Sequence, residues 1–87
     1  LERYHTSNHL NPQTIIVMIH VFKTSVISEK QVRQVEPFLK TLMSNEEWNF
    51  DLEDCDKILR VETEKVAPET VITLLKSQGF ECTELSE

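Results

Sequence analysis

Two cysteines and three histidines are the side chains of this sequence best suited to ligate a soft metal ion or to form a nucleophile–base pair. Cys55 and Cys82 lie far apart and do not make a disulfide framework. His5 and His9 lie in a polar N-terminal stretch, and His20 lies within an apolar run. No serine or cysteine stands at a recognisable spacing from His20. We therefore expect no catalytic residue and no enzyme, and keep Cys55, Cys82 and His20 as weak candidates for metal ligands.

Acidic side chains gather in the middle of the chain without a neighbouring base: Glu46, Glu47, Asp51, Glu53, Asp54 and Asp56. Their alternation with apolar residues is typical of a solvated strand face. The segment lacks the repeat and the glycine of an EF-hand, although carboxylates do suit hard cations. A docking surface for a basic partner is the other alternative to a solvated face.

The net charge of the whole chain is -6, from nine Lys and Arg against fifteen Asp and Glu. This balance argues against nucleic-acid binding and against docking on anionic lipid, both of which need a basic face. The absence of a signal-peptide pattern and the two unpaired cysteines predict a cytoplasmic protein.

A strand followed directly by a helix is predicted for the first half of the chain. Residues 15–24 are rich in β-branched side chains, which indicates a central strand buried on both faces. A helix is expected to begin at Ser28, because Ser28 and Gln31 have the spacing of a capping box.

The predicted helix has one apolar face, formed by Val32, Val35, Phe38 or Leu39, and Leu42. Two i,i+4 ion pairs, Glu29 with Arg33 and Glu36 with Lys40, are expected on its outer side. Pro37 interrupts the pattern, so a kink or an early break is expected there.

The second half predicts a hairpin, a helix and a short strand. Trp48, Phe50 and Leu52 alternate with polar residues, and a second strand follows over 58–63. Pro68 suits the first turn of a helix, and Gly79 suits a left-handed cap at its end. A last strand is expected over 80–85.

The order βαββαβ predicts an α+β, ferredoxin-like fold: a four-stranded antiparallel sheet of order 4-1-3-2 with two helices on one face. We expect a flexible tail over 1–14 and one domain over 15–87, with Trp48 and Phe50 in the core. Ser28, Cys55 and Cys82 would share one end of the sheet. The strand order separates the two cysteines by roughly 9–10 Å, so an internal disulfide is not expected.

Over 18–85 the chain resembles the heavy-metal-associated domains of copper chaperones and metal-transporting ATPases. The resemblance is carried by Phe22-Lys23-Thr24, Val35-Glu36-Pro37-Phe38-Leu39, Trp48-Asn49-Phe50-Asp51, Asp56-Lys57-Ile58-Leu59-Arg60-Val61 and Gly79-Phe80. It implies the same fold and a Cys-x-x-Cys site for Cu(I) or Zn(II) at the start of the first helix. The corresponding residues here are Ser28 and Gln31, which offer no thiolate.

These observations predict a degenerate member of that family, without cofactor, that acts as a protein-interaction or regulatory module. Its expected partner is a protein with a basic surface, and exposed edge strands offer a route to weak self-association. The alternative is a protein that binds or traffics copper or zinc through Cys55, Cys82 or the histidines.

Overall fold

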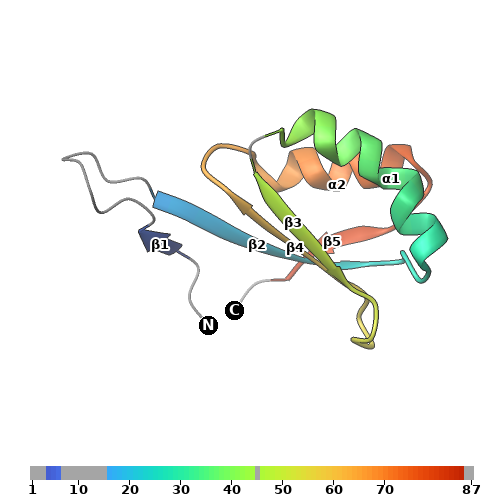
Figure 1. Cartoon of the computed structure of the whole chain (residues 1–87). Coiled ribbons are helices and arrows are strands. Elements are labelled where there is room, and N and C mark those ends of the chain that lie inside the picture. The colour runs from blue at the N-terminus through green and yellow to red at the C-terminus, as the bar shows by residue number, and fades with distance from the viewer. Residues whose placement is uncertain (1–3, 7–15, 45, 86–87) are drawn as a thin grey trace.

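The computed structural model describes residues 4–6, 16–44 and 46–85, and within them the predicted order of elements is present (Figure 1). One further short strand precedes that order. The elements are β1 (Tyr4–Thr6), β2 (Ile16–Thr24), α1 (Glu29–Leu42), β3 (Glu47–Asp51), β4 (Ile58–Thr63), α2 (Pro68–Ser77) and β5 (Cys82–Glu84).

The sheet is antiparallel throughout and has β2 at its centre. One edge of β2 pairs with β4, which in turn pairs with β3. The other edge pairs with β5 over 22–24 and with β1 over 16–18. The order β5-β2-β4-β3 is the predicted 4-1-3-2 arrangement, and both helices lie on the same side of the sheet (Figure 1). The α+β, ferredoxin-like fold is thus confirmed.

Strand β1 lies within the segment 1–14, for which a flexible tail is expected. Its three residues pair with the first residues of β2, Tyr4 opposite Met18 and Thr6 opposite Ile16. The other residues of that segment, His9 among them, lie outside the described part of the chain. Neither helix of the described part has the length and apolar character that a membrane crossing requires.

The core lies between the helices and one face of the sheet. Phe22, Leu59 and Val61 from the sheet and Leu39 and Leu75 from the helices are fully buried. On the opposite face of β2 the side chains are half-buried or, at Lys23, exposed. The prediction that this strand is central is confirmed, but burial on both faces is wrong, because both helices cover the same face.

Helix α1 continues through Pro37 to Leu42, so the predicted early break is wrong. Pro37 is exposed, and Val35 and Leu39 on either side of it are buried in the core. Packing of this face outweighs the one hydrogen bond that proline removes. Of the two alternatives for the apolar face, Leu39 is the buried residue and Phe38 is 46% exposed.

The end of α2 is fixed by Gly79, as predicted. Gly79 has a φ of 91°, which is the left-handed conformation that glycine adopts without strain. The Gly79 N–H donates to Lys76 O and the Phe80 N–H donates to Leu75 O, each over 3.0 Å. These two bonds make a Schellman motif and direct the chain from α2 into β5.

Candidate functional site

The junction between β2 and α1, where the resembling family binds metal, is closed by its own hydrogen bonds. Ser28 Oγ accepts from the Gln31 N–H over 3.2 Å, which is the predicted cap. Gln31 Oε1 reaches back and accepts from the Ile27 N–H over 2.8 Å. The side chains of Ser28 and Gln31, which the resemblance places at metal-ligand positions, are therefore engaged with backbone groups.

Thr24 joins the three chain segments that meet at this end of the sheet. It pairs with Cys82 on one side, and on the other its N–H donates to Asp56 O (3.3 Å) and Lys57 O (3.1 Å). Cys82 and the turn that carries Cys55 therefore lie on opposite sides of β2. Both cysteines are free thiols, in agreement with the expectation of no internal disulfide.

The two cysteines differ in their suitability as ligands. Cys82 is buried, and this burial raises the pKa of its thiol to about 11, against a smaller lowering effect of Lys76. Cys55 is exposed on the β3–β4 turn, where its sulfur and carboxylate oxygens of Asp54 and Asp56 lie within 4.8 Å of one another. This group supplies three ligands from one turn, one fewer than a closed tetrahedral zinc site needs.

We expect thiol reagents to distinguish these cysteines. Only the thiolate reacts, so at pH 8 exposed Cys55 should be alkylated rapidly and Cys82 only slowly. Mass spectrometry of folded protein treated with iodoacetamide should show one fast modification, and Cys55→Ser should abolish it. Fast modification of Cys82 in the folded protein would contradict the described burial.

His20 is buried on the face of β2 that also carries Phe22, and it makes a structural contact. Its Nε2 lies 3.2 Å from Val66 O, which links β2 to the segment before α2. In the described part of the chain its Nδ1 has no hydrogen-bond partner, and a carboxylate oxygen of Glu84 lies 3.7 Å away. Within the described residues His20 belongs to no group of three ligands that lie close enough for a metal ion.

The acidic residues of the run 46–56 have different surroundings, and Glu47, Asp51 and Glu53 among them are exposed. Glu46 accepts from Thr63 Oγ1 over 2.7 Å and braces the start of the hairpin. Glu47 lies on the open face of the sheet opposite Glu62. Asp54 Oδ1 accepts from the Asp56 N–H over 2.8 Å and shapes the turn. Of the acidic run, Asp51 and Glu53 line a concave feature of the described surface.

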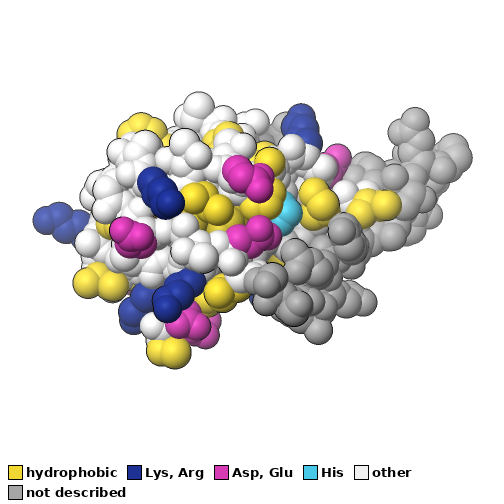
Figure 2. All heavy atoms as spheres, turned by 180° about the vertical axis from the view of Figure 1, so that it is seen from behind, with side chains coloured by type: hydrophobic (Ala, Val, Ile, Leu, Met, Phe, Trp, Pro, Cys, Tyr) yellow, Lys and Arg dark blue, Asp and Glu magenta, His cyan; other side chains and the backbone are white. Residues whose placement is uncertain are grey.

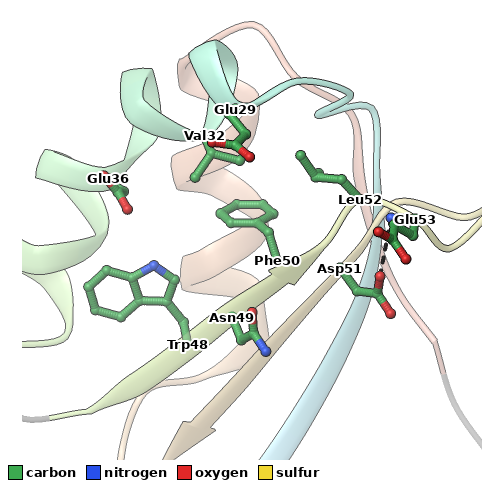
Figure 3. Close-up of a pocket in the computed structure, with 9 residues that line it drawn as sticks. All are labelled: Glu29, Val32, Glu36, Trp48, Asn49, Phe50, Asp51, Leu52 and Glu53. Carbon is green, nitrogen blue, oxygen red and sulfur yellow. Dashed lines mark hydrogen bonds between the residues drawn. The ribbon is translucent and has the colours of Figure 1, made fainter.

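That feature is a groove of about 610 Å³ between α1 and β3 (Figure 3). We call it the α1–β3 groove. Half-buried apolar side chains form its floor, and carboxylates and one amide border it. The full lining is Glu29, Val32, Glu36, Trp48, Asn49, Phe50, Asp51, Leu52 and Glu53.

Glu29 and Glu36 line the groove but were not predicted as site residues, since both were expected in ion pairs on the outer side of α1. Within the described residues only Glu29 has such a partner, Arg33 at 3.8 Å, and both side chains are exposed. Glu29, Val32 and Glu36 are spaced by three and four residues, so they lie on one face of α1. That spacing could have placed the two glutamates at the border of the apolar face.

Trp48 and Phe50 were expected in the core and occupy its margin instead. Both pack against the buried cluster but remain partly accessible in the groove.

Comparison with protein-family models, with curated proteins and with solved structures gave no match to this chain.

Proposed function

We propose that this chain is a heavy-metal-associated-like domain without the metal loop of that family, and that it acts as a non-catalytic protein-interaction module. The observation that carries the proposal is the α1–β3 groove, which combines an apolar floor with four carboxylates, and none of the described residues that line it is a lysine or arginine. Such a surface suits a basic protein partner. The same charge, and the net charge of -6, disfavour nucleic acid and anionic lipid.

The residues at the family's metal position do not fit a soft metal ion. Cu(I) and Zn(II) favour thiolate ligands, whereas Ser28 offers a neutral hydroxyl and Gln31 a neutral amide. The oxygens of both already accept backbone N–H groups. A metal bound there would have to break the cap that starts α1, at a cost of about 1 kcal/mol for the serine alone.

A metal-handling function is the second candidate, and the Asp54–Cys55–Asp56 group is the observation that favours it. A thiolate and two carboxylates are acceptable zinc ligands. Against this candidate, Asp56 lies 3.8 Å from the ammonium of Lys23, and Cys82 is buried on the other side of β2. Two unpaired cysteines suit a reducing compartment such as the cytosol under either proposal.

Titration of the reduced protein with Cu(I) and with Zn(II) separates the two candidates. The interaction proposal predicts no stoichiometric, cysteine-dependent site of sub-micromolar affinity. Cys55→Ser and Cys82→Ser are the matched controls. A stoichiometric site would contradict the proposal, and its loss in Cys55→Ser alone would assign it to the β3–β4 turn.

A further inference from the structure

We infer that the α1–β3 groove binds an extended basic segment of another protein, which adds to the free edge of β3 as a new strand. The inference rests on the proposed function and names the chemical class of its partner: a segment in which lysine or arginine alternates with strand-forming residues.

The first support is the unpaired edge of β3. In the described part of the chain β3 pairs only with β4 and ends the sheet on that side. An edge strand directs the N–H and C=O groups of alternate residues outwards, where an added strand can pair with them. The lining includes consecutive residues from Trp48 to Glu53, which belong to both faces of the strand. The groove therefore runs along the edge itself.

The second support is the apolar floor on the α1 side of that edge. Figure 3 shows Trp48 and Phe50 directed towards α1, with Val32 above Phe50. A side chain of an added strand that points to this side would lie against these groups. The long aliphatic stems of lysine and arginine suit such a surface, and the aromatic rings attract their cationic heads.

The third support is the placement of the four carboxylates along the groove. Glu29 and Glu36 stand on α1 above the floor, and Asp51 and Glu53 lie at the end of β3 (Figure 3). Whichever face of an added strand carries its cations, a carboxylate of the groove would therefore lie on that side. The four acids do not converge: the one group of the described residues that is compact enough for a metal ion is the Asp54–Cys55–Asp56 turn. Four carboxylates spread along a groove suit an extended segment with several cations better than they suit a single metal ion.

A second copy of the chain is a poor occupant of the same groove. Each copy carries a net charge of -6, so approach of two acidic surfaces is opposed by repulsion. The opposite side of the molecule carries acidic and basic side chains interspersed (Figure 2), without the single sign of charge that the groove has. Charge complementarity therefore favours a basic partner at the α1–β3 groove.

Trp48, the single tryptophan of the chain, reports binding directly. The probe is a short, end-blocked peptide in which lysine alternates with valine. We expect a saturable change in Trp48 fluorescence with one peptide per chain, and an affinity that falls as salt rises. A peptide with proline in place of valine carries the same charge but cannot pair as a strand, and it should bind at least about tenfold more weakly.

Two charge variants locate the site. Glu36→Lys should weaken binding of the lysine–valine peptide about tenfold or more, because it places a cation inside the groove. Glu81→Lys makes the same change in net charge on the exposed segment before β5 and should change affinity less than about twofold. Light scattering should show that the native chain and both variants are monomers.

Three results would overturn the inference: no binding of the lysine–valine peptide, equal binding of the proline peptide, or equal weakening by Glu36→Lys and Glu81→Lys. A dimer dissociated by Glu36→Lys would assign the groove to a second copy and overturn it as well. None of these results creates a cysteine-dependent metal site, so failure of the inference is distinguishable from failure of the proposed function.

Discussion

The double variant Ser28→Cys/Gln31→Cys is expected to bind one Cu(I) per chain with sub-micromolar affinity, whereas the native chain should not. The two positions stand at the N-cap and first turn of α1, with Ser28 Oγ only 3.2 Å from the Gln31 N–H. Two cysteines there would direct both sulfurs at the start of the helix. The helix N-terminus lowers the pKa of thiols placed at it, so the thiolates that Cu(I) requires would form at neutral pH.

The variant also loses the present capping hydrogen bonds. Replacement of the capping serine is expected to cost about 1 kcal/mol of stability. Helix α1 should remain folded, because Val35 and Leu39 still bury it against the core. Cu(I) competition titrations, with circular dichroism to confirm folding, provide the measurement. Ser28→Cys and Gln31→Cys alone are the controls, since each adds one thiolate and should bind far more weakly. A folded double variant without Cu(I) binding would contradict the correspondence with the metal-binding family.

Phe22→Ala should lower the free energy of unfolding by about 3–5 kcal/mol. Phe22 has no exposed surface and lies at the centre of the sheet, opposite Leu59 of β4 and Glu84 of β5. Domains of this length have a total stability of roughly 4–13 kcal/mol. The variant should therefore be marginally folded or unfolded at room temperature, as measured by urea unfolding followed by circular dichroism.

Phe38→Ala is the matched control for that result. The same side chain is removed, but Phe38 is 46% exposed on α1 and lies outside the buried cluster. Its loss should cost less than about 1.5 kcal/mol, because little apolar surface is returned to water. Equal destabilisation by the two variants would contradict the assignment of Leu39, rather than Phe38, to the core face of α1.

The fold was predictable because local signals agree with one another along the chain. The β-branched run before Ser28 identified the central strand, and Pro68 and Gly79 marked the two ends of α2. The predicted break at Pro37 was wrong because it considered only the local cost of proline in a helix. It left out the packing of α1 into the core on either side of Pro37. Tertiary burial decided that position, as it decided between Phe38 and Leu39.

The candidate site was less predictable because it depends on how far α1 covers the sheet. Alternation placed Trp48 and Phe50 on the core face correctly, but it carried no information on the gap between them and the helix. The acidic run is typical of a solvated face, and it carried no sign that Glu46 braces the hairpin or that Asp54 shapes a turn. Glu29 and Glu36 complete the groove from a distant part of the sequence, and only the register of α1 against β3 brings them there.

The junction from Thr24 to Gln31 is held in place by hydrogen bonds and buried packing. Thr24 Oγ1 donates to Lys57 O over 2.8 Å and accepts from the Val26 N–H over 3.2 Å, so the strand exit is held firmly. Val26 is fully buried and anchors the loop before Ser28. These contacts position α1 independently of any metal ion. The α1–β3 groove, where we propose that a partner binds, is lined by residues further along the helix and by β3.

Amide hydrogen exchange at β3 is the most direct test that this edge is the working surface of the protein. With the lysine–valine peptide at saturation, outward-directed amides on alternate residues of Glu47–Asp51 should exchange much more slowly than in the free chain. Amides of β5, on the opposite edge, should be unchanged. Unchanged exchange at β3 with the peptide bound, or new protection at β5 instead, would contradict strand addition at the α1–β3 groove.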